Sequence, residues 1–243
     1  MNKCICFLTG CNGFLGSKLA EVLFNKKWDV VGIGRSSKPR SSISKYLIKY
    51  INKDYGEIRE IDFNKIIKKT SKYNRIALIH LAWSGINGLS DLSIKHQFNN
   101  VNKTISLFNT AKKSEFNIFI FAGSMEEQFA KEYLKTNLKK GLFNRHVIHA
   151  TAKKMARDAL KLQAKSKMKI IITTNSHLMG DGDYRDSFLQ VTLSKMLNGG
   201  LLEFTSGKQL FDVISVYDAV NIYEIIAKNF DKNKENWIGT GKP

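Results

Sequence analysis

Residues 4–16 of the chain read CICFLTGCNGFLG, and this stretch decides the fold. An apolar run passes through a glycine-rich turn into an amphipathic segment, so we predict a strand, a tight turn and a helix. Lacking a Cβ, Gly10 can form the turn, Gly13 lets the backbone approach a pyrophosphate, and Gly16 lets the helix pack on the strand. The phosphates would lie at the helix N-terminus, beside free N–H groups and the positive end of the dipole. This context predicts a dinucleotide site rather than a plain turn between strand and helix.

Apolar runs and amphipathic segments alternate over the first 175 residues. We predict strands over Cys4–Leu8, Asp29–Ile33, Ile58–Ile61, Arg75–Leu81, Ile118–Ala122 and Lys169–Thr174, and helices over Gly13–Asn25, His96–Lys113 and His149–Ser166. A parallel neighbour can be reached only by a crossover, usually a helix. The order therefore predicts a doubly wound parallel sheet with helices on both faces, a Rossmann-like α/β fold.

The pattern loosens after residue 175. A polar loop, GDGD at 180–183, precedes a predicted helix at Ser187–Leu197 and short strands around Leu202–Phe204 and Asp212–Val216. We expect residues 1–174 to form the dinucleotide-binding domain and 175–243 a partial substrate lobe, with Asp212–Asp218 returning to the core sheet. Such a lobe would cover the carboxyl edge of the sheet, where ligands of open α/β sheets bind.

Composition and charge narrow the class of protein. The 243 residues are 43% hydrophobic and 25% charged, which is ordinary for a globular chain. Lysine and arginine total 39 against 21 acids, and the net charge of +18 favours anionic ligands. The positive residues are scattered, with no concentrated stripe and no platform of arginine and aromatic residues. We therefore favour an enzyme with phosphorylated substrates over a nucleic-acid binder.

The three cysteines lie in and beside the first predicted strand. Cys4, Cys6 and Cys11 are too close together for a disulfide framework and lack partners for a metal site, so no metal is expected and a reducing cytoplasm fits. No apolar stretch reaches the length of about 18 residues that a membrane span requires. We predict no membrane span, with peripheral attachment through the basic surface as an alternative.

Several landmarks follow one another along the chain. They are TGCNGFLG at 9–16, IHLA at 79–82, NVNKT at 100–104, Ser124 after a predicted strand, Lys153 in a predicted helix, LFDVISVYD at 210–218 and IGTGKP at 238–243. In this order they resemble the extended short-chain dehydrogenase/reductase family, NAD(P)-dependent epimerases, dehydratases and reductases that act largely on nucleotide sugars. The resemblance spans the chain from end to end.

This resemblance implies a function and an assembly. We expect an NAD(P)-dependent epimerase or reductase of a nucleotide-activated sugar, serving surface-polysaccharide precursor synthesis; the alternative is a catalytically impaired dinucleotide-binding protein with a regulatory or structural role. Family members commonly pair through the helices that correspond to His96–Lys113 and His149–Ser166, which implies a homodimer. Members also usually continue past the last landmark into helices that wall the sugar pocket, so stopping at Pro243 implies a truncated lobe or an unusually open pocket.

The choice of cofactor depends on VGIGRS at residues 31–36. An Asp or Glu after the second strand would accept from the ribose hydroxyls of NAD, whereas an Arg attracts the 2′-phosphate of NADP. Because Arg35 and Ser36 stand there without an acid, and Lys38 or Arg40 follow, we predict NADP. NAD stays admissible if Arg35 stacks on adenine. The resemblance implies further cofactor contacts at Gly10, Asn12, Gly13, Phe14, Leu15, Gly16, Asp62, Leu81, Ala82 and Lys153, although Asp62 could equally cap a helix at Phe63–Lys69.

The expected reaction centre lacks its tyrosine. In the family, a tyrosine four residues before the helical lysine shares its helix face, and the lysine contacts the nicotinamide ribose and lowers the pKa of the phenol. Ser124 would hydrogen-bond the reacting oxygen and Lys153 occupies the lysine position. Four residues before Lys153, however, stands His149, and no tyrosine occurs from 134 to 183.

Three explanations stay open. His149 could exchange the proton, because imidazole has a pKa of about 6.5, near working pH. It could instead be a structural substitution in a protein that binds a dinucleotide without turnover. Finally, Tyr133, Tyr184 or His146 could reach in from elsewhere.

The resemblance also implies substrate contacts at Trp83, Glu126, His177 and Arg185. In the sugar dehydratases of the family, Asp-Glu comes directly after the serine or threonine. Here Met125 and Glu126 come after Ser124, which argues against dehydration. Epimerisation or ketone reduction remains. Glu126 and Glu127 also suit the start of a helix, whatever the chemistry. His177 replaces the asparagine of the RxFNxYGP segment. Phe211 replaces an arginine that often contacts the diphosphate, so Arg185 or Lys208 would have to compensate.

Overall fold

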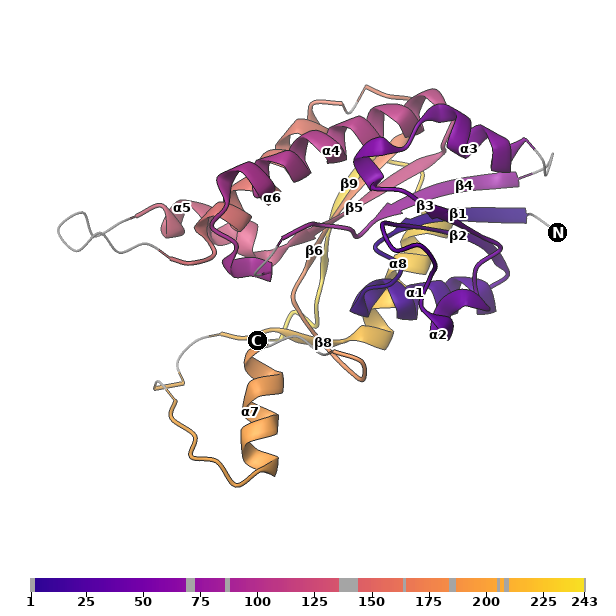
Figure 1. Ribbon diagram of the computed structural model, residues 1–243. Helices are drawn as coiled ribbons and strands as arrows, with labels where there is room; N and C mark the ends of the chain where they lie inside the picture. The colour runs from indigo at the N-terminus through magenta and orange to yellow at the C-terminus, as the bar shows by residue number, and fades with distance from the viewer. Residues whose placement is uncertain are drawn as a thin grey trace.

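A seven-stranded parallel sheet forms the centre of the molecule. The computed structural model describes residues 3–68, 73–85, 88–135, 144–163, 165–183, 187–204, 206–207 and 210–242. The strand order is β3-β2-β1-β4-β5-β6-β9, and every neighbouring pair is parallel (Figure 1). The strands are β1 Lys3–Thr9, β2 Trp28–Gly34, β3 Lys49–Asn52, β4 Tyr73–His80, β5 Ile118–Ser124, β6 Lys169–Asn175 and β9 Lys234–Ile238. The doubly wound α/β prediction is confirmed.

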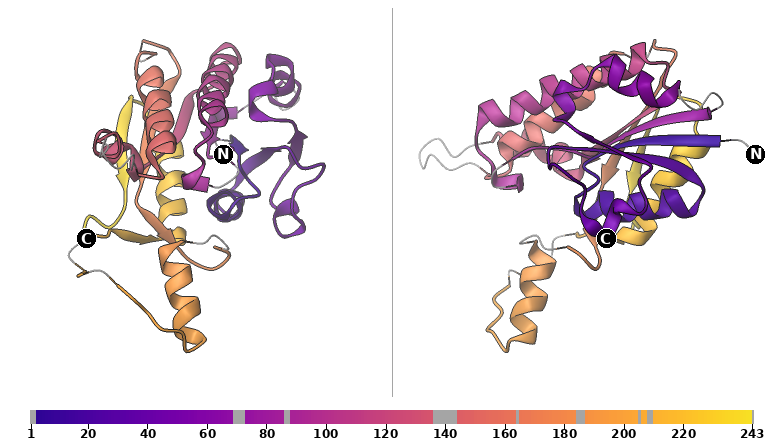
Figure 2. Two further views of the ribbon diagram at one scale, coloured as in Figure 1. Left: turned by 60° about the vertical axis from the view of Figure 1, so that its left-hand side comes forward. Right: turned by 45° about the vertical axis from the view of Figure 1, so that its right-hand side comes forward.

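Helices cover both faces of the sheet (Figures 1 and 2). One face carries α1 Phe14–Asn25, α2 Ser41–Ser44 and α8 Val216–Asn229, and the other carries α3 Glu60–Ile67, α4 Ile94–Lys113 and α6 Val147–Lys161. Shorter helices are η1 Tyr55–Glu57, η2 Gly88–Ser90, η3 Met125–Phe129 and α5 Ala130–Tyr133. Because successive side chains of a strand point to opposite faces, β1 contributes Cys6 and Leu8 to the α1 and α8 side and Ile5 and Phe7 to the α3 and α4 side.

The third strand differs from the prediction. No strand forms over 58–61: Ile58 lies in the connection after η1, and Glu60 begins α3. The third strand is β3, which pairs only with β2 at the edge of the sheet. Its residues are half-buried or exposed, so its sequence lacks the strong apolar run that marks the central strands.

The C-terminal part contains a small separate sheet. Strand β7, His177–Met179, pairs in parallel with β8, Val213–Ser215, and helix α7, Phe188–Leu197, projects away from the main sheet (Figure 1). Our prediction that Asp212–Asp218 returns to the core sheet is therefore wrong, and residues 202–204 form no strand. The strand that returns to the core sheet is β9, which pairs with β6. Its sequence, KENWI, is polar and did not predict a strand.

A buried arginine ties the returning strand to the sheet. Arg157 on α6 donates from Nε to Glu127 at 2.5 Å, from Nη1 to Glu235 of β9 at 2.8 Å, and from Nη2 to Thr174 of β6 at 2.5 Å. Its side chain is 9% exposed. Charge-assisted bonds in such a buried setting are stronger than surface ion pairs, so this group fixes β9 against β6.

The cysteines form no disulfide with one another. Cys4, Cys6 and Cys11 are thiols, and the last two are buried. Within the described ranges, no helix combines the length and the apolarity needed to cross a bilayer.

Candidate functional site

The glycine turn after β1 requires glycine for two physical reasons. Gly10 has φ of +73°, and a Cβ there would lie 2.9 Å from the backbone nitrogen of Ala82. A Cβ at Gly16 would overlap the carbonyl group of Gly10, so helix α1 can approach the strand only with glycine there. The N-cap Gly13 offers no side chain to the first turn, which also carries no acid. The free N–H groups and the helix dipole therefore suit a diphosphate.

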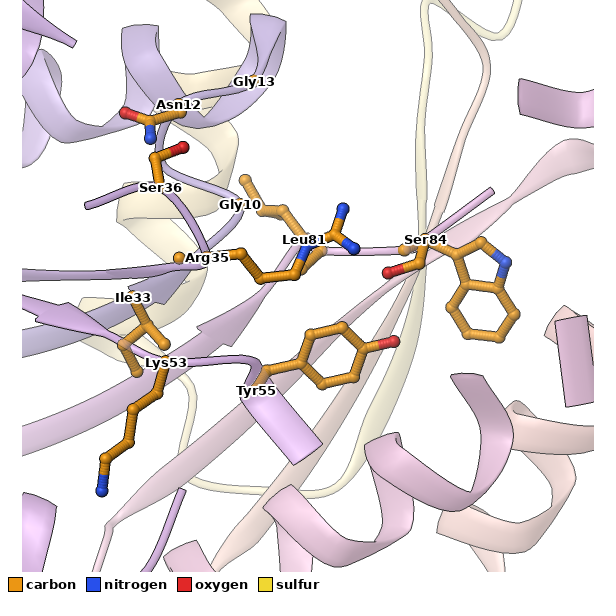
Figure 3. Close-up of a pocket in the computed structure, with 13 residues that line it drawn as sticks. Gly10, Asn12, Gly13, Ile33, Arg35, Ser36, Lys53, Tyr55, Leu81 and Ser84 are labelled. Carbon is orange, nitrogen blue, oxygen red and sulfur yellow. The ribbon is translucent and has the colours of Figure 1, made fainter. Parts of the chain in front are cut away.

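A cavity of about 320 Å³ opens beside this turn, at the carboxyl ends of β1, β2 and β4. Its lining residues are Gly10, Asn12, Gly13, Ile33, Gly34, Arg35, Ser36, Lys53, Tyr55, Leu81, Ala82, Trp83 and Ser84. Figure 3 shows the side chains of Arg35 and Tyr55 extending in the same direction across it, toward Ser84. No acidic residue is among those lining it, so the cavity favours an anionic ligand.

The loop that carries Arg35 is held by two asparagines. The side-chain amide of Asn52 donates to the carbonyls of Arg35 at 2.9 Å and Ser36 at 2.7 Å, and Asn12 Oδ1 accepts from the backbone N–H of Arg40 at 3.0 Å. Across the described residues, no carboxylate forms an ion pair with the Arg35 guanidinium. Its charge is thus available to a ligand.

Asp62 does not line the cavity. It lies in the first turn of α3, where its carboxylate accepts from the backbone N–H of Arg59 at 2.9 Å and from Lys53 Nζ at 2.8 Å. Burial raises the pKa of Asp62, but the bonds from Lys53 and Arg59 outweigh it and the net pKa is lowered. The structure therefore shows Asp62 capping α3, and the contact with adenine stays a prediction.

The predicted reaction residues lie at the end of β5 and in the first turns of α6. Ser124 is the last residue of β5; its Oγ accepts from the N–H of Glu126 at 3.3 Å, and its own N–H donates to Glu127 at 2.6 Å. His149 and Lys153 lie in the first turns of α6 and are only 5% and 6% exposed. None of the three lines the cavity.

His149 is buried without a polar partner. Neither ring nitrogen has a hydrogen bond in the described part of the chain, and the ring meets Trp83 edge-on at 6.1 Å between centroids. Burial, and then the charge of Lys153, lower the pKa of His149 to about 3. The imidazole is therefore neutral at neutral pH and a weak base.

Lys153 is bonded to the sheet rather than to the cavity. Its Nζ donates to the carbonyl of Ala122 at 2.6 Å and lies 4.3 Å from the ring centroid of Trp83 and 4.8 Å from that of Phe121. Burial lowers the pKa of Lys153 to about 8, with Arg157 acting in the same direction and Glu127 against it. These rings stabilise the ammonium through their negative faces.

Trp83 stands between the cavity and the reaction residues. Its ring lines the cavity and also covers His149 and Lys153. Its Nε1 donates to Gln97 at 2.7 Å, and Gln97 in turn donates to Asp91 at 3.2 Å, with both partners buried. Trp83 thus contacts both the cavity and the reaction residues.

Glu126 gathers two further titratable side chains. The phenol of Tyr133 donates to it at 2.6 Å, and His146 Nδ1 lies 3.2 Å from the same oxygen. Burial raises the pKa of Glu126, but the bonds from His146 and Tyr133 lower it more, so the net pKa is lowered. Tyr133 and His146 therefore bind Glu126, and the third explanation stays a prediction.

The remaining predicted contacts lie in the small lobe or outside the described residues. His177 stacks on Phe211 with 3.8 Å between centroids, and its N–H donates to the carbonyl of Asp212 at 3.2 Å. Arg185, Tyr184 and Lys208 fall outside the described residues, as does Pro243. Phe14, Leu15 and Gly16 form the start of α1 and do not line the cavity.

Sequence reasoning missed five lining residues, Ile33, Gly34, Lys53, Tyr55 and Ser84, and one support. Tyr55 and Lys53 follow β3, so placing that strand correctly would have found them. Ser84 lies two residues beyond IHLA, a signal that was present but unused. Asn52, which holds the Arg35 loop, could not be found because its contacts join separate strands.

The strand order and the glycine turn define a doubly wound, dinucleotide-binding class of protein. A sequence profile described as the NAD dependent epimerase/dehydratase family matches residues 6–238, and the chain belongs to this family. The resemblance drawn from the motifs is thereby confirmed. A search of curated proteins found no match.

Solved structures of similar fold include several sugar epimerases. UDP-glucose 4-epimerase from Thermotoga maritima, with UDP-glucose, is 18% identical with a TM-score of 0.75, over 98% of this chain and 77% of that one. UDP-N-acetylglucosamine 4-epimerase from Methanobrevibacter ruminantium, in complex with UDP-N-acetylmuramic acid, is 20% identical with a TM-score of 0.75, over 100% and 78%. UDP-glucose 4-epimerase from Brucella ovis, in complex with NAD, is 18% identical with a TM-score of 0.73, over 98% and 78%. At these identities the likeness shows a shared fold.

Proposed function

We propose that the chain is an NADP-dependent epimerase or reductase of a nucleotide-activated sugar. The observation that carries the proposal is the cavity: a glycine turn with an uncapped helix N-terminus at one side, Arg35 across it, and no carboxylate in its lining. NAD fits the same cavity if Arg35 stacks on adenine. The Brucella protein, which has a similar fold, binds NAD, and this supports the alternative.

The roles we propose follow from position. A bound nicotinamide would accept or return a hydride at the substrate carbon. Ser124 would hydrogen-bond the reacting oxygen, His149 would take the proton, and Lys153 would hold the ribose. The Trp83 ring contacts both His149 and Lys153, so it would help to hold them in these roles. Trp83, Glu126, His177 and Arg185 are the proposed substrate contacts.

The same burial supports the second candidate function. His149 has no hydrogen bond, Lys153 is already bonded to Ala122, and Trp83 covers both. A dinucleotide-binding protein without turnover, with a regulatory or structural role, would retain such a centre. Both candidates would bind a dinucleotide in the cavity. They differ in whether His149 and Lys153 support turnover.

The deciding experiment is an NADPH fluorescence titration followed by turnover assays with a panel of UDP- and dTDP-sugars. Turnover by the wild type supports the enzyme. Tight binding without turnover, with activity restored by His149→Tyr, would indicate a lapsed active site. Binding without turnover in either protein supports the regulatory role, and failure of both NADP and NAD to bind excludes both candidates.

Homodimerisation and cellular role belong to the same proposal. We place the protein in the cytoplasm, where its thiols would stay reduced, in the synthesis of surface-polysaccharide precursors. Pairing would use α4 and α6; α4 exposes Asn102 and Ser106, and α6 exposes Met155, with Leu162 exposed at its C-cap. Since polar residues weaken the core of an interface, we expect a concentration-dependent dimer, which sedimentation velocity can test.

A further inference from the structure

Asn100, the first residue of the NVNKT segment, is a buried polar residue to which the proposed function gives no role. It lies on α4 with an exposed fraction of 1%, and its side chain bonds to two residues that line the cavity, Tyr55 and Ser84. A buried carboxamide is costly unless its donors and its acceptor are paired. The partners of Asn100 therefore explain why an asparagine can occupy the inner face of this helix.

The backbone of Ser84 fixes the orientation of the Asn100 amide. The Ser84 N–H donates to Asn100 Oδ1 at 3.1 Å, and Asn100 Nδ2 donates to the Ser84 carbonyl at 2.6 Å. Because a backbone N–H only donates and a backbone carbonyl only accepts, the oxygen and the nitrogen of this amide cannot exchange places. The amide atom that Tyr55 contacts is therefore an acceptor.

The phenol of Tyr55 is left with a single hydrogen-bonding role toward the cavity. It donates its hydrogen to Asn100 Oδ1 at 2.7 Å. Burial, and then the charge of Asp54, raise the pKa of Tyr55. Arg35 and Ser84 act in the opposite direction without reversing the shift, so the phenol keeps this hydrogen at neutral pH. Toward a ligand the phenol oxygen can then only accept, whereas the Ser84 hydroxyl can turn to donate or to accept.

The ring of Tyr55 is held in place by neighbouring elements. Tyr55 begins η1, and the N-cap Asp54 accepts from the backbone N–H of Gly56 at 2.9 Å. Lys103 of α4 forms an ion pair with Asp54 at 2.9 Å, and the His80 ring lies 4.8 Å from the Tyr55 ring between centroids. Since Tyr55 is only 5% exposed, its acceptor is presented at a fixed place, which lowers the cost of ordering it on binding.

The position of Tyr55 in the fold indicates which end of a dinucleotide it would contact. Tyr55 follows β3, which pairs with β2, and Arg35 follows β2. These strands lie on one side of β1 and its glycine turn, whereas β5, which ends at Ser124, lies on the other side. With the diphosphate at the turn and the nicotinamide toward Ser124, the adenine would lie on the side of Arg35 and Tyr55, which extend together across the cavity (Figure 3). The exocyclic amino group of adenine is a hydrogen-bond donor and so complements this acceptor.

We propose that Asn100 fixes Tyr55 as a hydrogen-bond acceptor, and that Tyr55 thereby selects a dinucleotide whose adenine carries its amino group. This deepens the proposed function and rests on it. Asn100 is the positioning residue, and Tyr55 is the specificity-determining residue. In hypoxanthine a carbonyl oxygen replaces the amino group, so that two acceptors would face each other and binding would be disfavoured.

The test compares NADP with nicotinamide hypoxanthine dinucleotide phosphate by calorimetry on the full chain, or the two corresponding NAD ligands if NAD binds more tightly. We expect the wild type to bind the adenine form about tenfold more tightly, the value of one lost hydrogen bond. Tyr55→Phe should bind both forms equally. Asn100→Ala should also lose the preference, because the released phenol hydrogen can be donated to the hypoxanthine carbonyl. A merely structural role of Asn100 would weaken both ligands and leave their ratio unchanged.

Tyr223→Phe is the matched control. Tyr223 is a buried tyrosine on α8 that also donates to an asparagine, Asn175, at 3.0 Å, and it does not line the cavity. The preference for the adenine form should therefore be unchanged in this variant. A second arm uses the 3-acetylpyridine analogue of NADP, which lacks the amino group of the nicotinamide carboxamide. A preference against this analogue that Tyr55→Phe abolishes would place Tyr55 at the nicotinamide end and overturn the proposal.

Equal binding of the adenine and hypoxanthine forms by the wild type would also overturn the proposal, as would a preference that survives in Tyr55→Phe. A preference kept in Tyr55→Phe and lost in Asp62→Asn would assign the amino group to Asp62 instead. Failure of both NADP and NAD to bind would remove the proposed function, and this inference with it. Binding without turnover leaves the inference intact, because the ratio of affinities does not depend on catalysis.

Discussion

The dinucleotide cavity and the reaction centre lie next to each other and are built in opposite ways. The cavity is open and positive: no side chain caps the N-terminus of α1, and no carboxylate of the described residues forms an ion pair with the Arg35 guanidinium. At the reaction centre Lys153 is bonded to the sheet, and His149 is buried with its ring edge-on to Trp83. Binding and chemistry are thus separable in this fold, and experiments should perturb one without the other.

The largest effect is expected in the glycine turn. In Gly10→Val the side chain would meet the Ala82 backbone at a left-handed φ, so we expect a loss of about 4 kcal/mol in unfolding free energy and no detectable NADP binding. Urea unfolding and calorimetry measure both. Gly182→Ala is the control: φ is +83° but nothing lies within 4 Å, so only about 1 kcal/mol of backbone strain should appear. Equal losses in both variants would contradict the close packing of the turn.

The stability of the protein should depend on pH because Lys153 is buried in the reaction centre. Lys153 has a pKa lowered from 10.5 to about 8, so between these values the unfolded chain binds more protons than the folded one. The stability of the wild type should therefore rise with pH across this window, by about 3 kcal/mol relative to Lys153→Met. Denaturant unfolding at pH 7.5 and 10.5 measures the difference. Lys154→Met, half-exposed and paired with Asp158, should retain the rise.

The next largest effect is expected on the affinity for NADP relative to NAD. Arg35→Gln should weaken NADP binding by about 2 kcal/mol, roughly thirtyfold, because a charge-assisted contact is lost, while NAD binding changes little. Calorimetry with both dinucleotides measures the ratio. Arg59→Gln removes a positive charge outside the cavity lining and controls for net charge. Equal weakening toward NAD would instead show Arg35 stacking on adenine.

The smallest effect tests whether a change at Trp83 leaves NADP binding in the cavity unaffected. Trp83→Phe keeps a ring over Lys153 but removes the bond to Gln97, so we expect about 1 kcal/mol lower stability with NADP affinity retained. Trp237→Phe is the matched control, since Trp237 donates to Asp212 at 2.8 Å but is 47% exposed. A large loss of NADP affinity in Trp83→Phe would show that cavity and centre are one site.

The sequence made the cavity more predictable than the reaction centre. The glycine turn and Arg35 were found because local chemistry dictates them: positive φ, close approach and charge. The edge strands β3 and β9 were missed because half-buried strands lack an apolar run, and the lining residue Tyr55, which follows β3, was missed with them. The position of Trp83, and that of His146 on Glu126, depend on contacts between separate elements, which no local pattern encodes.

The three hydrogen bonds of Arg157 have a consequence for folding during synthesis. Its guanidinium binds Glu127 and Thr174 early in the chain, but Glu235 joins only when the last strand arrives. While the ribosome is still adding residues before 234, the nascent sheet presents β6 as an unpaired border beside an incompletely satisfied cation. An exposed border of that kind invites pairing with other chains, so synthesis of the final segment is the moment at which a chaperone would matter most.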